Sequence, residues 1–303
     1  MKNYKIIYRK QDIGLRLSSL YRQRQLAIGI LDFAGRSELI DTLSWYNANM
    51  NSSIHVLTTE YRMEDNQDLI EKFPDATFIV LKDETSTGEF INAFADECDA
   101  TFFLVVRTDL SIIAFEGEKL MALMSNKNHP AVISPVMISS QGEVMPTLRA
   151  PFIRGKEVDP QSFMPNIESE KPEMNLYPLL EIGLYDRALF QRLRAYDVNI
   201  MGEFYQSLDF GVRCHLFGYS IVTVRMLAVQ FPNRISIIEN RSECDGMNRF
   251  YTKALSIRRI AGKNIIEKWK PYVDKEVLQE EVKKKQINIQ KTDFFTLQKN
   301  WKV

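Results

Sequence analysis

Short apolar runs recur along the first half of the chain, and helical patterns separate them. Their length and their content of Ile, Val, Leu and Phe are typical of buried parallel strands. The runs lie at residues 26–33, 53–59, 77–81, 101–106 and 131–138, and helical patterns at residues 37–46, 90–98 and 112–124. This alternation predicts an α/β fold with an open sheet and right-handed crossovers, whose ligands lie beyond the carboxyl ends of the strands.

Residues 201–230 predict a helix, a glycine stop and a buried strand. Leu208, Val212 and Leu216 form an apolar stripe at helical spacing. Asp209 and Arg213 are four residues apart, the spacing of a supporting ion pair on one helical face. Gly218 then ends the helix, and the β-branched residues of 219–230 indicate a strand.

Two further segments flank this helix and strand. Residues 151–178 contain five of the eleven prolines and no sustained periodicity, so we expect a long surface loop there. From residue 248 onward the pattern predicts basic helices. One of them has Ile257, Ala261 and Ile265 on a single face, and a second covers residues 273–285 beyond Pro271.

The composition is that of an ordinary globular protein. With 303 residues, 45% of them hydrophobic and 26% charged, the chain can form one large domain or two small ones. No apolar run approaches the roughly 18 to 20 residues that span a bilayer, and the N-terminus lacks a signal-peptide centre, so we expect a cytoplasmic protein. Cys98, Cys214 and Cys244 fit neither a disulfide framework nor a zinc site, which favours free buried thiols.

The formal net charge of zero conceals two basic ends. Residues 1–24 carry seven Lys and Arg against one Asp, and residues 253–303 carry thirteen against six acids. We therefore divide the chain into a basic N-terminal segment (1–24), an α/β domain (25–245) and a basic helical C-terminal extension (246–303). The basic ends leave two interpretations open, peripheral contact with the inner face of a membrane or a solvated surface. No nucleic-acid partner is expected.

Candidate chemistry lies at the end of the fourth predicted strand. Arg107 and Asp109 are two residues apart, so their side chains share a face of the strand and enter the ligand crevice. With the helix at 201–219, this order of motifs resembles the family-two-type glycosyltransferases of GT-A fold, including rhamnosyltransferase-like members, over roughly residues 25–232. The matching residues are Phe33, Gly35, Glu38, Leu39, Leu43, Gly88, Asp109, Pro135, Gly142, Arg187, Phe190, Asp197, Asp209, Arg213, Gly218 and Tyr219.

At most positions where the family has catalytic or binding residues, this chain has a different residue. Arg107 replaces the first aspartate of the aspartate-x-aspartate motif, and Gln206 and Ser207 replace the acidic pair that supplies the catalytic base. Three further replacements are Ala34 for an asparagine, Thr58 near the place of a base-contacting aspartate, and Phe231 near the place of a metal-binding histidine.

The resemblance implies a GT-A nucleotide-diphospho-sugar transferase fold, with a mixed and mostly parallel sheet flanked by helices. It also implies inverting transfer of a sugar from a nucleotide-sugar donor to an unidentified glycan, lipid-linked or protein acceptor. The donor would contact Asp32, Phe33, Thr58, Asp83, Arg107 and Asp109.

An inverting transfer needs a carboxylate base and positive charge for the departing diphosphate. Glu203, one helical turn before the missing acidic pair, is the first candidate base, and Asp209 the second, with a bracing role toward Arg213. Family members usually hold Mg²⁺ or Mn²⁺ at the diphosphate, and Asp109 would be the ligand if a metal binds. Arg107 would repel such an ion but could bind the diphosphate itself, and a plain Arg107–Asp109 ion pair is the alternative.

Two other functions stay open at this point. The replaced positions favour a catalytically inactive GT-A-like protein that serves as a binding or assembly module. The sequence disfavours the other function, a nucleotidyltransferase with a related sheet, because the chain lacks a glycine-rich phosphate loop near its first strand.

Overall fold

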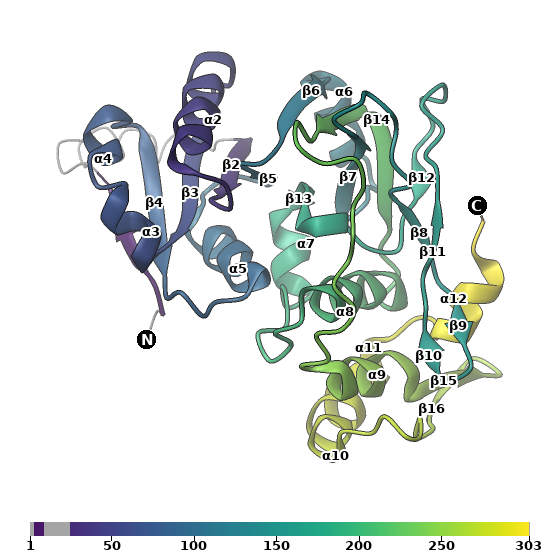
Figure 1. Cartoon of the computed structure of the whole chain (residues 1–303). Helices are drawn as coiled ribbons and strands as arrows, with labels where there is room; N and C mark the ends of the chain where they lie inside the picture. Colours follow the sequence, from purple (N-terminus) through teal and green to yellow (C-terminus); the bar gives the residue numbers. More distant parts are fainter. Residues whose placement is uncertain (1–2, 9–24, 303) are drawn as a thin grey trace.

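A ten-stranded mixed sheet forms the centre of the computed structural model, which describes residues 3–8 and 25–302 (Figure 1). Most of the predicted N-terminal segment lies outside the described residues. The strand order is β1-β4-β3-β2-β5-β13-β7-β14-β12, with β6 beside β14. The strands of this sheet are β1 (Lys5–Ile7), β2 (Leu26–Leu31), β3 (Ser53–Thr59), β4 (Ala76–Leu81), β5 (Phe102–Arg107), β6 (Ser111–Phe115), β7 (Val132–Ile138), β12 (Glu173–Met174), β13 (Gly183–Asp186) and β14 (Ile221–Gln230).

The long strands share one direction. β4, β3, β2 and β5 pair in parallel, and β7 pairs in parallel with β14. β13 lies antiparallel between β5 and β7, so these two strands also point the same way. The mostly parallel α/β sheet predicted from the apolar runs is confirmed, and its carboxyl ends meet at one edge.

Helices cover the faces of this sheet. α5 begins with a capping box between Ser86 and Glu89. In α8 every residue except Glu203 is buried, because the helix lies between the sheet and the C-terminal extension (Figure 1). Gly218, in the left-handed region at φ 86°, ends the segment as predicted. The helices before the extension are α2 (Arg36–Asn49), α3 (Glu60–Asp65), α4 (Leu69–Lys72), α5 (Thr87–Glu97), α6 (Gly117–Met124), η2 (Leu179–Glu181), α7 (Arg187–Arg192) and α8 (Glu203–Leu216).

An aromatic cluster forms the centre of the core. Phe103 of β5 stacks on Tyr185 of β13 with ring centroids 4.9 Å apart, and Phe94, Phe190 and Phe210 surround this pair. At most 1% of the surface of each of these residues is exposed, for Phe94, Phe103, Phe190 and Tyr185. The cluster joins α5, α7 and α8 to the sheet through offset and edge-to-face ring contacts.

Two predictions about the middle of the chain were wrong. Residues 151–178, expected as a loop, contain the short strands β9 (Ile153–Arg154), β10 (Glu157–Val158), β11 (Gln161–Phe163) and β12. Strands of two or three residues are too short to show a period in the sequence. The helical pattern expected over residues 112–124 begins as strand β6, whose partner is β14, and only α6 is helical.

The C-terminal extension mixes helices with a hairpin. The helix expected to carry Ile257, Ala261 and Ile265 on one face is wrong, because these residues lie in the hairpin of β15 (Ile257–Ile260) and β16 (Lys263–Ile266). Ala261 and Gly262 turn the chain at φ 47° and 79°, the positive angles of a tight hairpin turn. The helices of the extension are α9 (Met247–Leu255), α10 (Lys275–Val277), η3 (Leu278–Gln286), α11 (Ile287–Ile289) and α12 (Phe294–Asn300).

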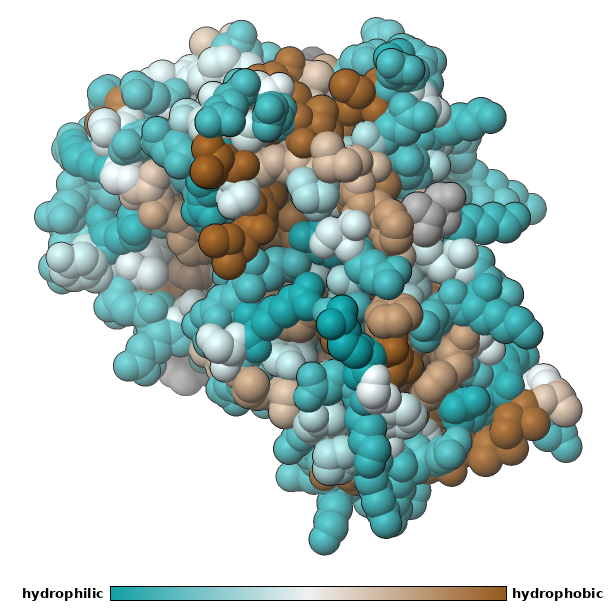
Figure 2. All heavy atoms as spheres, turned by 45° about the vertical axis from the view of Figure 1, so that its right-hand side comes forward, coloured by the Kyte–Doolittle hydropathy of each residue, from teal (hydrophilic) through white to brown (hydrophobic). Residues whose placement is uncertain are grey.

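The surface is hydrophilic over most of the face in Figure 2, with apolar side chains gathered mainly over its upper half. Exposed apolar residues include Ile235 and Ile238 in the segment 231–246 that follows β14. Across the described part of the chain, a helix with the length and apolarity to cross a membrane is not found. All three cysteines are free, as predicted. Cys98 and Cys214 are buried, but the prediction of a buried thiol was wrong for Cys244, which is exposed.

Candidate functional site

The loops that follow β2, β3 and β5 meet at the carboxyl edge of the sheet. Asp32 follows β2 and accepts a hydrogen bond of 2.8 Å from the Thr58 hydroxyl of β3. The backbone N–H groups of Phe33 and Ala34 donate to the Thr108 hydroxyl at 3.0 and 2.8 Å, which fixes the loop after β2 against the end of β5. Burial raises the pKa of Asp32, while the Thr58 hydroxyl and Arg62 oppose that rise.

Two arginines hold one carboxylate beside this loop. Arg107, the last residue of β5, donates from Nε and Nη2 to the two oxygens of Asp109 over 2.9 and 3.0 Å, so the ion pair named above as the alternative to diphosphate binding is formed. Arg234, from the segment 231–246, donates to Asp109 Oδ2 over 2.6 Å. The Arg107 guanidinium also lies 4.5 Å from the ring centroid of Phe33. Both guanidinium groups therefore contact the same carboxylate at this corner of the sheet edge.

Glu203 faces the same corner from the first turn of α8. Its Oε1 lies 4.0 Å from Arg107 Nη1, and 40% of its side chain is exposed. A Cβ on the preceding Gly202 would lie 2.5 Å from the Glu243 carbonyl oxygen, so glycine is needed for the segment 231–246 to approach α8. Burial raises the pKa of Glu203, Glu243 adds to the rise, and Arg107 and Arg234 oppose it.

A second carboxyl group, Glu181, lies beneath Glu203 and was missed in the sequence. It is fully buried, and both Leu180 and Glu181 have left-handed backbones, at φ 54° and 56°. Such conformations cost non-glycine residues about 1 to 3 kcal/mol each and cluster at functional sites. Glu181 stands in an apolar stretch between Leu180 and Ile182, and this context was the available signal.

Glu181 lies close enough to Glu203 for the two carboxyl groups to influence each other's pKa. The Ser207 hydroxyl donates to Glu181 Oε1, whereas Oε2 has no hydrogen-bond partner in the described structure. Burial, followed by the negative charge of Glu203, raises the pKa of Glu181 well above its usual range. Burial and the charge of Glu203 therefore both favour the protonated form of Glu181.

Other residues predicted for the site lie apart from this group. Asp83 follows β4 and accepts a hydrogen bond of 3.1 Å from the Tyr61 N–H. Asp209 is buried, and ion pairs join it to Arg213 at 2.8 Å and to Lys253 at 2.6 Å. The bracing role is formed as predicted, and the structure does not bring Asp209 to Glu203.

The residues that replace family motifs have structural partners. The Gln206 side chain accepts from the Gly88 N–H at 2.9 Å and donates to the Ser86 hydroxyl at 3.0 Å. Phe231 is fully buried. These positions therefore contribute hydrogen bonds and packing, and the charge at the site comes from elsewhere.

His215 and Cys214 do not form a reactive pair. Both are buried, and His215 Nε2 lies 2.9 Å from the Asn175 carbonyl oxygen. Burial lowers the pKa of His215 to about 4 and raises the pKa of Cys214 to about 12. Because burial disfavours the charged form of each group, the two side chains pack in the core and do not form a nucleophile and base, as expected from their adjacent places on one helix.

The residues at the site do not fit a divalent metal ion. Both oxygens of Asp109 are bonded to guanidinium groups. Within residues 3–8 and 25–302, no group of three or more His, Cys, Asp or Glu side chains is placed to hold a metal. Mg²⁺ and Mn²⁺ need oxygen ligands that are free of competing cations.

A cavity of about 320 Å³ adjoins this corner between α2 and β6. Trp45 and Tyr46 of α2 provide aromatic walls, and Pro232 belongs to the segment 231–246. The acidic side chains of Glu38 and Asp41 of α2 also line it, so the cavity is of mixed polarity.

The chain has a fold of the GT-A type. The chain is similar to the crystal structure of GalNAc-T7 with UDP, GalNAc and Mn²⁺, with a TM-score of 0.62 and 11% sequence identity over 92% of this chain. It is also similar to S. aureus TarS, with a TM-score of 0.50 and 12% identity over 76% of this chain. The chain spans 57% of the length of GalNAc-T7 and 39% of that of TarS. No protein-family model matches the sequence, and no curated protein sequence matches it either.

Proposed function

We propose that the chain is an inverting glycosyltransferase that binds a nucleotide-sugar donor without a divalent metal ion. The observation that carries this proposal is the convergence of Arg107, Arg234 and the Glu203–Glu181 pair on one corner of a GT-A fold. In this proposal Arg107 and Arg234 supply the anion site, and the glutamate pair supplies the base. A fold alone does not define a reaction, so the argument depends on these side chains.

Arg107 and Arg234 would bind the diphosphate of the donor. Planar guanidinium groups donate paired hydrogen bonds to phosphate oxygens, which replaces the charge that a metal ion gives in other transferases. Arg107 is held in place by β5 and by the Phe33 ring, whereas the Arg234 side chain is 39% exposed and can shift toward a ligand. As the bond between the sugar and the diphosphate breaks, the two arginines stabilise the charge on the departing oxygen.

Glu203 would act as the general base. An acceptor hydroxyl oxygen attacks the anomeric carbon, the bond from that carbon to the nucleoside diphosphate breaks with inversion, and the hydroxyl proton moves to the Glu203 carboxylate. Glu181 keeps its proton at the start, so Glu203 enters the reaction ionised. The raised pKa of Glu203 brings its basicity closer to neutral pH, where a general base is most effective.

The test combines binding and transfer. Isothermal titration with a panel of nucleoside diphosphates and nucleotide sugars is run with Mn²⁺ and with EDTA. We expect binding that is indifferent to EDTA and is lost in Arg107→Ala. Arg225→Ala is the matched control, because Arg225 makes an exposed ion pair with Glu170 away from the site.

Glu203→Gln should keep donor binding and lose transfer by about 100-fold or more, the usual range for a general base. Full transfer activity in this variant would refute the base assignment. If none of the nucleotides binds, the glycosyltransferase proposal is wrong as a whole. Binding without transfer in the unsubstituted protein would favour the alternative, a GT-A-like binding module, which the absence of acids at Gln206 and Ser207 supports.

A further inference from the structure

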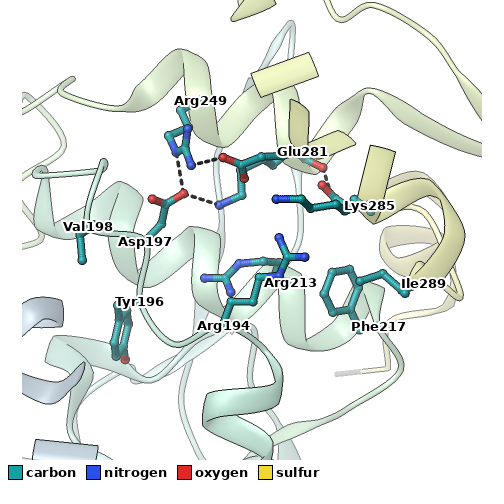
Figure 3. Close-up of a pocket in the computed structure, with 12 residues that line it drawn as sticks. Arg194, Tyr196, Asp197, Val198, Arg213, Phe217, Arg249, Glu281, Lys285 and Ile289 are labelled. Atoms are coloured by element: carbon teal, nitrogen blue, oxygen red, sulfur yellow. Dashed lines mark hydrogen bonds and ion pairs between the residues drawn. The ribbon is translucent and has the colours of Figure 1, made fainter. Parts of the chain in front are cut away.

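A basic cavity lies between α8 and the C-terminal extension, away from the site at the sheet edge. It has a volume of about 260 Å³ and is lined by five cationic side chains and two acidic ones (Figure 3). The acids are Asp197 and Glu281, and the cations are Arg194, Arg213, Arg249, Lys253 and Lys285. Glu203 begins α8 and Arg213 lies near its end, about 15 Å further along the helix axis at 1.5 Å per residue.

Three of the cations are neutralised by acids. Arg249 Nε donates to Asp197 over 2.6 Å, and its Nη2 pairs with Glu281. Lys253 contacts Asp197 at 2.7 Å and the buried Asp209 at 2.6 Å. Arg213 pairs with the same Asp209. These interactions account for every carboxylate in and directly behind the cavity.

Arg194 and Lys285 are the two remaining cations. Neither side chain has an ion pair or a side-chain hydrogen bond among the residues described by the structure, although both line the cavity. Figure 3 shows Arg194, Arg213 and Lys285 converging on its centre from different elements. The cavity therefore carries an excess of two positive charges.

The backbone that presents Arg194 is held in an unusual conformation. Arg194 and Ala195 have φ angles of 67° and 51°, the left-handed region that non-glycine residues rarely adopt. Arg213 donates to the carbonyl oxygens of Leu193 and Ala195, so the guanidinium clamps this turn on both sides. Consecutive strained residues kept in place by a buried cation are typical of a ligand site.

One side of the cavity is apolar. Phe217 and Ile289 lie together there, opposite the charged groups (Figure 3). A ligand that fits both sides needs an anionic head with about two negative charges and a small organic body. A phosphate monoester carries about 1.5 to 2 negative charges at neutral pH and three acceptor oxygens.

We propose that this cavity binds a small soluble phosphate monoester, with its phosphoryl group between Arg194 and Lys285 and its organic group against Phe217 and Ile289. The volume of the cavity accommodates a phosphate and one small ring. The proposal does not depend on sugar transfer at the sheet edge.

The experiment uses phenyl phosphate as the probe and isothermal titration of the full chain. We expect saturable binding, weakened about 100-fold or more in the double variant Arg194→Gln/Lys285→Gln, because both charged hydrogen bonds to the phosphoryl group are lost. The control variant Arg192→Gln/Lys283→Gln removes two cations from the neighbouring α7 and η3 outside the lining of the cavity. It should retain the affinity of the unsubstituted protein.

A second measurement needs no variant. Phenyl phosphate should protect Lys285 from an amine-acetylating reagent, read by mass spectrometry, and leave Lys283 and Lys284 unprotected. The proposal is overturned if the unsubstituted protein does not bind phenyl phosphate, or if both double variants weaken binding equally. It is also overturned if phenyl phosphate changes the acetylation of the three lysines to the same extent. Binding to phosphatidic-acid vesicles without binding of phenyl phosphate also overturns it, since the ligand would then be a lipid headgroup.

Discussion

The raised pKa of Glu181 beside Glu203 predicts how the free energy of unfolding changes with pH. The perturbation is Glu181→Gln. The amide oxygen can still accept from the Ser207 hydroxyl, and the amide N–H₂ can donate to Glu203 as a protonated Glu181 can. The substitution therefore keeps the hydrogen bonds and removes one titration from the folded state.

The direction and size of this change in the free energy of unfolding follow from the difference in the pKa of Glu181 between the folded and unfolded states. Because the folded-state pKa of Glu181 is raised, the native protein holds a proton that the unfolded chain releases above about pH 4.3. The free energy of unfolding of the wild type therefore falls as pH rises from that value to the folded pKa, by up to about 1.4 kcal/mol per pH unit. Glu181→Gln lacks this loss, so its stability relative to wild type should grow by up to about 2.7 kcal/mol between about pH 5 and about pH 7.

The assay is urea denaturation followed by tryptophan fluorescence at about pH 5, 6 and 7. The result is the slope against pH of the difference in the free energy of unfolding between Glu181→Gln and wild type. A constant cost of the amide does not change this slope. Glu118→Gln, an exposed glutamate of α6, is the control and should show no such slope. Parallel profiles for wild type and Glu181→Gln would show that Glu181 is ionised in the folded protein, and the proposed protonation of Glu181 would be refuted.

Two further substitutions test packing and buried charge. Asp209→Asn leaves Arg213 and Lys253 without their buried carboxylate and should lower the free energy of unfolding by about 3 to 5 kcal/mol in urea denaturation. The exposed Asp41→Asn is its control, and a loss below about 1 kcal/mol would contradict the ion-pair account. Gly211→Ala places a Cβ 2.2 Å from the Leu176 carbonyl oxygen and should cost about 1 to 3 kcal/mol by thermal denaturation. Gly117→Ala, whose nearest contact is at 3.2 Å from the Phe115 ring, should be close to neutral, and equal stability of the two variants would argue against the close approach of α8 to residue 176.

The parallel core of the fold was predictable because its strands are buried on both faces and appear as apolar runs. β3 matches its predicted range, and β2, β4, β5 and β7 differ from theirs by one or two residues at an end. The hairpin at 257–266 was not predictable from the apolar spacing. Ile257 and Ile265 fit a helical period by coincidence, and the Ala261–Gly262 turn determines the structure.

The candidate site was predictable only in part. Arg107 and Asp109 were found because residues at the end of a parallel strand face the ligand crevice. Glu181 and Arg234 were not, since each reaches the site from a segment without regular periodicity and through contacts across more than twenty residues of sequence. Only the three-dimensional arrangement shows that a buried carboxyl lies beneath Glu203.

The ion pairs of Lys253 have a consequence for how the chain unfolds. Lys253 belongs to the C-terminal extension, yet its ammonium group compensates Asp197 and Asp209 of the preceding α/β part. A chain that ends before α9 would leave Asp209 with Arg213 as its single ion-pair partner and would expose Tyr205 of α8, which packs on Phe250. The extension and the sheet therefore depend on one another for stability, and we expect them to unfold in one cooperative transition.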